Sequence, residues 1–189
     1  MTIVEMLRKA RGLVPEKAAI ICGGTTFSYE EVYVKSNTLA NFLVGIGLGK
    51  GERVGLLMKK SPEAVISFAG VAAAGGIVFP VDYTQTIAHI QFIINLTKPS
   101  ALIVSSEFQP LLFNLSLPCS DDRIIVVGQI GRRQYTPWEE ILSEDSQAGP
   151  DVKIKEDDTA YLNFTSGTTG VPKAALATHA NIFWNTVAS

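Results

Sequence analysis

Short apolar runs alternate with helical patterns in the first half of the chain, and this alternation restricts the possible folds most strongly. Residues 53–58 (RVGLLM) and 77–81 (IVFPV) have the continuous apolar character of strands that are covered on both faces. Between them, Ser61 can cap a helix that has proline at its first position, and Gly75 can end it. Alternating strands and helices predict an α/β fold, in which layered βαβ units build a mostly parallel sheet covered by helices.

The remaining elements follow from caps, glycines and apolar periodicity. A capping box at residues 28–31 (SYEE) starts one helix, and residues 64–74 are apolar nearly all round, which predicts deep burial. Residues 138–142 are expected to form one helical turn on a surface connection. Further strands are expected at residues 18–22, 25–27, 101–104, 123–127 and 174–177, and further helices at residues 3–12, 86–96, 107–114 and 178–189.

Composition and charge exclude several classes of protein. The 189 residues are 47% hydrophobic and 18% charged, which is ordinary for a globular chain with a sizeable core. A net charge of −2 without a basic cluster argues against nucleic acid as the main partner. No apolar stretch reaches about 18 residues and the N-terminus has no hydrophobic signal core, so we expect a cytoplasmic protein without a transmembrane segment. Cys22 and Cys119 form no metal-ligand spacing with the two histidines, so we expect no metal site.

The stretch of residues 161–173 (YLNFTSGTTGVPK) carries the clearest chemical signal. It turns from an apolar run into hydroxyl side chains set among glycines, and it ends in proline and lysine. Glycines let backbone N–H groups converge on an anion, hydroxyls donate to phosphate oxygens and lysine supplies a positive charge. The candidate polyphosphate-binding residues are Thr165, Ser166, Gly167, Thr168, Thr169, Gly170 and Lys173.

An ordinary polar turn between two strands is the simpler alternative, because serine, threonine and glycine are common in turns. A turn, however, does not require a run of hydroxyls followed by a lysine. A Walker A loop needs Gly-Lys-Ser/Thr at the start of a helix, whereas here Gly170 precedes a valine and Lys173 precedes a plausible strand. We therefore predict a strand, a phosphate-binding loop and a second strand.

The loop resembles the signature of the adenylate-forming (AMP-binding) superfamily, which includes acyl-CoA synthetases, 4-coumarate-CoA ligases, luciferases and the adenylation domains of nonribosomal peptide synthetases. Residues 26–32 (TFSYEEV) and 73–82 (AAGGIVFPVD) are similar to two further motifs of that superfamily, in the same order along the chain. Ala174 stands where glycine is common in the superfamily, a departure that should matter little if the position only needs a small residue.

The resemblance implies an enzyme, an AMP-forming acid–thiol ligase. A carboxylic acid would attack the α-phosphorus of ATP to give an acyl-adenylate and pyrophosphate, and coenzyme A would then take the acyl group. Mg²⁺ would accompany ATP, and the residues from Thr165 to Gly170, with Lys173, would bind the β- and γ-phosphates. A carrier-protein-loading adenylation domain and a non-catalytic nucleotide-binding module remain alternatives. Fatty, aryl, short-chain and amino acids remain open as substrates, as does assembly into a homodimer.

The resemblance also implies how the chain is organised. Residues 1–150 would form an N-terminal α/β subdomain and residues 151–189 would begin the next segment, with the acidic stretch 143–158 as the boundary or as a long surface loop. The superfamily's ribose-binding aspartate and C-terminal lysine have no match here, so we expect an N-terminal fragment without catalytic residues that is inactive alone. The acyl pocket of the superfamily is built mainly from residues beyond Ser189.

Polar residues near the expected loop allow alternative interpretations. Asp82 follows a strand and could contact a ligand, but an aspartate at such a position more often caps the next turn. Asp157 and Asp158 precede the loop, but a strand of about four to six residues would hold them on the order of 13 to 20 Å from it. We expect them to cap the outer end of that strand, not to hold Mg²⁺. His179 either lines the acyl or nucleotide pocket or serves as a helix start or core residue.

Overall fold

The computed structural model describes residues 1–131, 134–165 and 173–188, and of Thr165 only the backbone. The helices of these residues are α1 (Ile3–Leu13), α2 (Tyr29–Gly45), α3 (Pro62–Ala73), α4 (Ile87–Thr97), α5 (Gln109–Leu112), α6 (Trp138–Ile141) and α7 (His179–Val187). The strands are β1 (Ala18–Cys22), β2 (Thr25–Ser28), β3 (Arg53–Leu57), β4 (Ile77–Pro80), β5 (Ala101–Ser105), β6 (Ile124–Val127), β7 (Thr136–Pro137), β8 (Thr159–Thr165) and β9 (Lys173–Thr178). Short 3-10 helices at Ser106–Phe108 and Asp121–Arg123 complete the fold.

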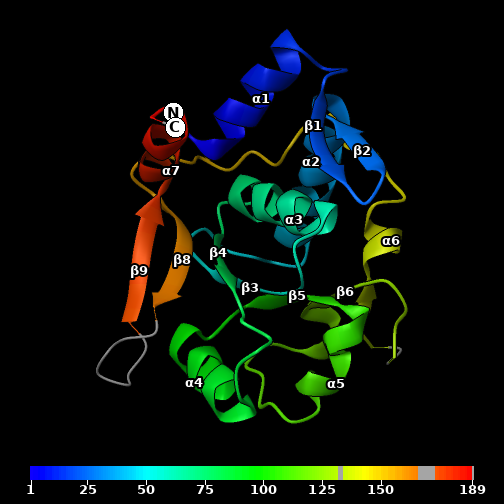
Figure 1. Cartoon of the computed structure of the whole chain (residues 1–189), viewed down its shortest axis with the longest axis vertical. Coiled ribbons are helices and arrows are strands. Elements are labelled where there is room, and N and C mark those ends of the chain that lie inside the picture. The colour runs from blue at the N-terminus through cyan, green and yellow to red at the C-terminus, as the bar shows by residue number, and fades with distance from the viewer. Residues whose placement is uncertain (132–133, 166–172, 189) are drawn as a thin grey trace.

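The strands form two sheets, which Figure 1 shows with their labels. β1 and β2 pair as an antiparallel hairpin. The other strands form one sheet in the order β7-β6-β5-β3-β4-β8-β9. Neighbouring strands of this sheet run parallel except for β8 and β9, which are antiparallel. The predicted α/β class with a mostly parallel sheet is confirmed.

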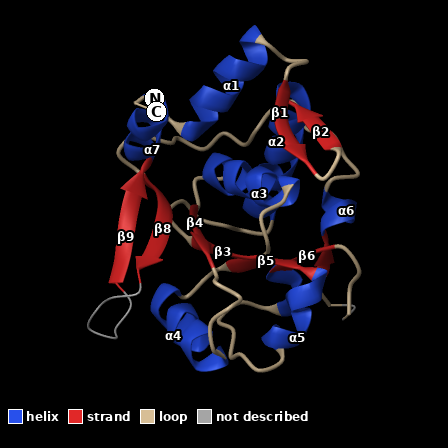
Figure 2. Ribbon diagram, viewed as in Figure 1, coloured by secondary structure: helices blue, strands red, loops and turns tan. Residues whose placement is uncertain are grey.

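Helices cover both faces of the large sheet, with α1, α2 and α3 on one side and α4 and α5 on the other (Figure 2). Successive strand residues alternate between these two layers. In β4, Val78 packs with the cluster around α2 and α3, whereas the next residue, Phe79, packs with the cluster around α4. Ile103 and Leu102 of β5 divide in the same way. Both faces are apolar because both are covered, as the continuous apolar runs predict.

Local sequence signals determine the helix starts. The Ser28 hydroxyl accepts from the Glu31 N–H at 3.2 Å, and the Glu31 carboxylate accepts from the Ser28 N–H at 2.7 Å. Thr2 and Glu5 form the same reciprocal pair at the start of α1. Ser61 caps α3, which has proline in its first turn. The predicted caps at Ser28 and Ser61 are confirmed.

Three sequence-based expectations are wrong in detail. α3 is not buried all round, because Val65 is 48% exposed. The turn α6 is not a surface connection, because Trp138 and Ile141 pack into the core beneath α2. The last helix, α7, is shorter than predicted, because it ends at Val187 and Ala188 is its C-cap. The sequence pattern predicts that a segment is helical, but it does not predict which other elements pack against that helix.

The acidic stretch of residues 143–158 contains no helix or strand and runs beside α2. The Asn41 amide donates to the Ala148 carbonyl at 2.9 Å, and the Lys50 ammonium donates to the Lys153 carbonyl at 2.8 Å. The next strand, β8, pairs with β4 and so extends the same sheet. Within the described part of the chain, no helix has the length and apolar character needed to cross a membrane.

Candidate functional site

The candidate site lies at the carboxyl edge of the parallel sheet, where β8 ends. β8 and β9 form an antiparallel hairpin in which Thr165 and Lys173 are paired residues. Strand, connection and strand therefore follow one another as the sequence predicts. Because β8 is parallel to β4, the connection between Thr165 and Lys173 leaves from the sheet edge at which ligands gather in open α/β folds.

The described residues include only part of the predicted phosphate loop. Ser166, Gly167, Thr168, Thr169 and Gly170 lie outside the described residues. Thr165 is the last residue of β8, and only its backbone is described. Lys173 is the first residue of β9 and is exposed. The assignment of these residues to phosphate stays a prediction.

A second feature of the carboxyl edge is the crevice between β3 and β5. β3 leads through α3 to β4 on one side, whereas its neighbour β5 leads through α5 to β6 on the other, and such a reversal marks a common ligand position. Here the Lys59 ammonium lies 2.8 Å from the Glu107 carboxylate. The Phe108 ring stacks on Tyr83 with centroids 4.5 Å apart. The side chains at the crevice therefore partner one another.

Asp82, directly after β4, caps a turn as predicted. Its carboxylate accepts from the Thr84 N–H at 2.9 Å, from the Thr84 hydroxyl at 2.6 Å and from the Gln85 amide at 2.9 Å. These hydrogen bonds, those from Thr84 first, lower the pKa of Asp82. Because its carboxylate is already engaged within the turn, Asp82 serves the structure here.

Asp158 holds the outer end of the β8–β9 hairpin, as predicted. Its carboxylate accepts from the Lys155 N–H at 2.7 Å and lies 2.6 Å from the Lys50 ammonium. The hydrogen bond from Lys155, and then that from Lys50, lower the pKa of Asp158. Among the residues that the structure describes, no group of three His, Cys, Asp or Glu side chains could hold a metal ion.

His179 joins α7 to the N-terminal helix. Its side chain is 1% exposed, and its Nδ1 accepts from the Ile3 N–H at 3.3 Å. The neutral ring therefore carries its proton on Nε2. Burial lowers the pKa of His179, and the carboxylate of Asp158 partly opposes this effect. Of the two interpretations offered by the sequence, the structure supports core packing.

A cavity of about 590 Å³ opens between α3 and the strands β4 and β8. Apolar atoms form nearly all of its lining, and Lys60 lines it as well. The complete lining is Leu56, Lys60, Ser61, Ala64, Val65, Phe68, Val78, Pro80 and Tyr161. We call this the α3 cavity.

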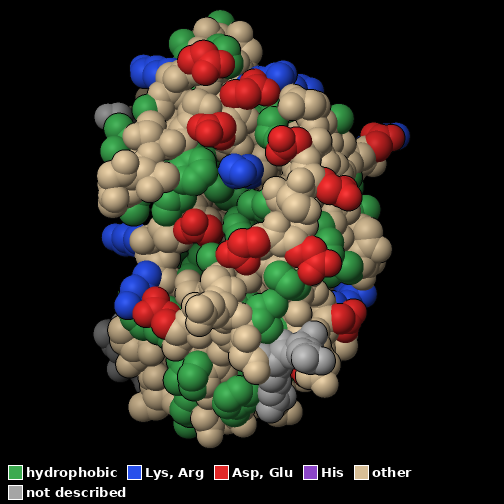
Figure 3. Space-filling model, turned by 90° about the vertical axis from the view of Figure 1, so that its right-hand side faces the viewer, with side chains coloured by type: hydrophobic (Ala, Val, Ile, Leu, Met, Phe, Trp, Pro, Cys, Tyr) green, Lys and Arg blue, Asp and Glu red, His purple; other side chains and the backbone are tan. Residues whose placement is uncertain are grey.

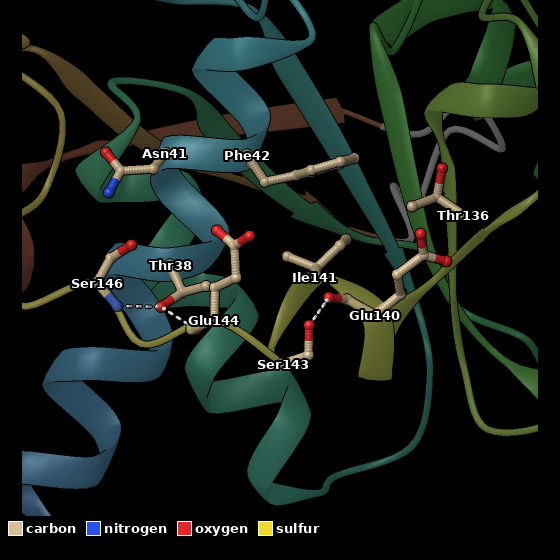
Figure 4. A pocket seen from close by; sticks show the side chains of 9 residues that line it. All are labelled: Thr38, Asn41, Phe42, Thr136, Glu140, Ile141, Ser143, Glu144 and Ser146. Carbon is tan, nitrogen blue, oxygen red and sulfur yellow. Dashed lines mark hydrogen bonds between the residues drawn. The ribbon is translucent and has the colours of Figure 1, made fainter.

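A second cavity, of about 550 Å³, lies between α2 and α6 at the other end of the sheet (Figure 4). It is lined by Thr38, Asn41, Phe42, Thr136, Glu140, Ile141, Ser143, Glu144 and Ser146. On the face of the molecule that carries α6, acidic side chains spread across the middle, and basic side chains lie mostly toward the edges (Figure 3). We call this the α6 cavity.

Polar groups of the α6 cavity mainly hold its own walls together. The Thr38 hydroxyl accepts from the Ser146 N–H at 3.0 Å and lies within hydrogen-bonding distance of the Glu144 carbonyl, at 3.2 Å. The Ser143 hydroxyl donates to the Glu140 carbonyl at 2.7 Å. These bonds fasten the acidic stretch to α2, which gives the hydroxyls a structural function.

Sequence reasoning missed the α3 cavity and the pairing of Lys59 with Glu107. Lys59 and Lys60 are both exposed. Their position directly after a buried strand was the available signal, because residues there lie at the carboxyl edge of the sheet. Lys59 pairs with Glu107 because β5 lies beside β3. No local sequence pattern predicts that pairing of strands.

Comparison with known proteins identifies the family. The AMP-binding enzyme family matches residues 7–189. Tyrocidine synthase 3 of Brevibacillus parabrevis is 30% identical over 187 residues, which cover 97% of this chain and 3% of the synthase. A medium/long-chain-fatty-acid–CoA/3-oxocholest-4-en-26-oate–CoA ligase of Mycobacterium marinum is 27% identical over 192 residues, covering 97% of this chain and 35% of the ligase.

A solved structure supports the same assignment. The crystal structure of the anthranilate CoA ligase AuaEII in complex with anthranoyl-AMP superimposes with a TM-score of 0.86 and 27% identity. The match covers 95% of this chain and 35% of that one, so the chain spans about a third of the length of the CoA ligases that it matches. The chain belongs to the AMP-binding enzyme family, whose members are AMP-forming ligases.

Proposed function

We propose that this chain supplies the phosphate-binding part of a ligase that activates a carboxylic acid with ATP and transfers the acyl group to coenzyme A. The acid would attack the α-phosphorus of ATP, so that an acyl-adenylate forms and pyrophosphate leaves. The observation that carries this proposal is the β8–β9 hairpin, whose connection begins at the carboxyl edge of a parallel sheet.

The residues in and near the hairpin suit a polyphosphate. Lys173 follows the glycine- and threonine-rich connection directly at the start of β9 and is exposed. Its ammonium would offset the negative charge that grows on the departing pyrophosphate, and the hydroxyls from Thr165 to Thr169 would donate to phosphate oxygens. Bound ATP would supply the phosphorus that reacts, and Mg²⁺ would enter with its phosphates because the described residues offer no cluster to hold the ion.

Transfer to a carrier protein is the alternative to coenzyme A. Tyrocidine synthase 3 is similar over nearly the whole chain, as is the fatty-acid CoA ligase. The two reactions share the adenylation step and differ in the thiol that accepts the acyl group. Dependence of product formation on coenzyme A or on a carrier protein separates them.

Titration of the chain with MgATP tests the phosphate assignment directly. We expect saturable shifts of backbone amide resonances in β8 and β9, observed by NMR. Replacement Lys173→Ala should weaken MgATP binding about tenfold, the effect of losing a hydrogen bond to a charged group of about 1.4 kcal/mol. The matched control is Lys9→Ala in α1, an exposed lysine of the opposite end of the chain, which should bind MgATP like the parent. Shifts that are absent, or equal in both variants, would contradict the assignment.

A further inference from the structure

We infer that α1 is a detachable helix, which His179 holds against α2, α3 and α7 at neutral pH and releases when its imidazole ring is protonated. The inference goes beyond the proposed function, because it involves neither ATP nor the acid. It depends on how α1 packs, on the polar contacts at its two ends and on the hydrogen-bond acceptor that His179 presents to it.

α1 packs loosely on the rest of the molecule and lies at its edge (Figure 1). None of the residues of α1, all of which the structure describes, is fully buried, and Leu13 at its end is 72% exposed. A cavity of about 290 Å³ lies beneath the helix, lined by Ile3, Met6, Leu7 and Ala10 together with residues of α2, α3 and α7. Side chains that face such a space lack part of the contacts that a closely packed core provides. Apolar packing alone therefore holds α1 weakly.

Polar contacts fasten both ends of α1. At its start, the Ile3 N–H donates to Nδ1 of His179 at 3.3 Å, and the N-terminal ammonium lies 2.7 Å from the Glu156 carboxylate. Near its end, the Arg11 guanidinium donates to the Glu30 carboxylate at 2.5 and 2.9 Å. Glu156 is 66% exposed and Arg11 is 37% exposed, so water screens both ion pairs. The hydrogen bond to the buried His179 is the contact that is shielded from water.

His179 can hold α1 in this way only while its ring is neutral. The neutral ring accepts with Nδ1, whereas a protonated ring carries N–H groups on both nitrogens. The ring is 1% exposed, so after protonation two N–H donors would face each other in a buried site. Release of α1 would give both donors and the charged ring access to water. Protonation therefore favours the released helix.

Charged groups around the ring determine the pH range of the release. Burial is the largest effect and lowers the pKa of His179 from its ordinary value of 6.5. The carboxylates of Asp158, which precedes β8, and of Glu5 in α1 raise this pKa, whereas the ammonium groups of Lys50 and the N-terminus lower it further. Asp158 and Lys50 lie 2.6 Å apart, so their effects on the ring oppose each other. The attached helix is thus fully stable above about pH 6.5, and this stability is lost as the pH falls.

The connection that follows α1 would remain in place. The Pro15 carbonyl accepts from the Glu30 N–H at 3.0 Å, and the Lys17 carbonyl accepts from the Tyr29 N–H at 3.1 Å. Both hydrogen bonds join the connection to the start of α2. The helix would therefore pivot at Val14, its C-cap residue, and its release would uncover the apolar side chains of α2, α3 and α7 beneath it.

Amide hydrogen exchange, measured by mass spectrometry, tests the inference. We expect residues 4–13 to be at least about tenfold less protected than β5 at every pH, because the helix opens without the core. Their protection, corrected for the intrinsic pH dependence of exchange, should fall about five- to thirtyfold between about pH 7.5 and 5. Thirtyfold is the limit for a released ring with the ordinary pKa of 6.5.

Two variants separate the role of His179 from that of the other contacts. His179→Asn places an amide oxygen where the ring has Nδ1 and cannot be protonated, so the protection of α1 should no longer depend on pH. His179→Gln, which also accepts without titrating, takes its place if the Asn variant does not fold. Glu30→Gln is the control, because it weakens the other end of the helix. It should lower the protection of α1 about two- to fivefold at each pH and leave the pH dependence unchanged.

Three results would overturn the inference. Equal protection of α1 and β5 would show that the helix leaves only when the whole fold opens. A pH dependence that persists in His179→Asn would assign the release to another group, and protection of the parent chain that does not change with pH would show that there is no release. None of these results depends on whether the chain binds ATP, so the proposed function is tested separately.

Discussion

The α3 cavity and the α6 cavity have similar volumes, about 590 and 550 Å³, but their side chains serve different purposes. Hydroxyls and amides around the α6 cavity hold the acidic stretch of residues 143–158 against α2. That stretch has no strand or helix of its own, so its backbone groups need such partners. The α3 cavity lies between regular elements whose backbone bonds are already made. Its lining is held by the packing of these elements, such as the Phe68 and Tyr161 rings, whose centroids lie 5.7 Å apart.

Helices α2 and α3 pack against each other between the two cavities. Disrupting this contact should lower the free energy of unfolding more than any other change considered. A Cβ atom added at Gly70 would lie 2.8 Å from a Leu39 methyl carbon and 3.0 Å from the Ser36 carbonyl oxygen. We expect Gly70→Val to lower the free energy of unfolding by about 3 kcal/mol, measured by urea denaturation. Gly12→Val in α1, where a Cβ would meet nothing within 4 Å, is the matched control. Equal losses in both variants would show that α2 and α3 are not tightly packed.

Removal of one hydroxyl should distinguish the cavities. Thr38→Val keeps the side-chain shape but leaves the Ser146 N–H without its acceptor, so we expect a loss of about 1 to 2 kcal/mol in unfolding free energy. Thr186→Val removes a hydroxyl that bonds only the carbonyl one turn earlier on an exposed helix, and should cost far less. Equal losses in the two variants would show that the bond to Ser146 does not fasten the acidic stretch.

The burial of His179 where α7 meets the N-terminal helix predicts that the stability of the fold depends on pH. Burial lowers the pKa of His179 from its ordinary value of 6.5. The carboxylates of Asp158 and Glu5 oppose this effect, whereas the ammonium groups of Lys50 and the N-terminus add to it. The unfolded chain therefore takes up the proton first. Stability is complete above about pH 6.5 and falls as pH decreases, by at most about 1.4 kcal/mol per unit. His179→Gln should flatten this slope in urea titrations between about pH 5 and 7, and an unchanged slope would contradict the prediction.

Removing a single carboxylate should change stability least. We expect no change or a gain at the α6 cavity, and a small loss at the pair of Glu107 with Lys59. Glu140→Gln removes one of the two carboxylates of the α6 cavity and should leave stability unchanged or raise it by up to about 0.5 kcal/mol. Glu107→Gln breaks the exposed pair with Lys59 and should lower stability by about 0.2 to 1 kcal/mol. Thermal unfolding at low salt measures both. A marked loss in Glu140→Gln would show that this carboxylate has a structural partner.

The sequence predicts the elements well because their signals are local. The capping box at Ser28 and the cap at Ser61 depend on residues a few positions apart, and the structure confirms both. The exposed side of α3 at Val65 and the burial of Trp138 were not predictable, since both depend on which distant elements pack together. The same holds for the α3 cavity, where residues from β3, β4, α3 and β8 meet. The assignment of Thr165, Ser166, Gly167, Thr168, Thr169, Gly170 and Lys173 to phosphate stays a prediction from the sequence.

Exchange of labelled pyrophosphate into ATP tests the central claim most directly. The assay uses the longest gene product that contains this chain, with Mg²⁺ and decanoate. We predict exchange that requires the acid, falls at least about tenfold in Lys173→Ala and is retained in Lys9→Ala. Folded protein that shows no acid-dependent exchange with fatty, aryl or amino acids, or exchange that Lys173→Ala leaves unchanged, would contradict the assignment of the β8–β9 hairpin to ATP.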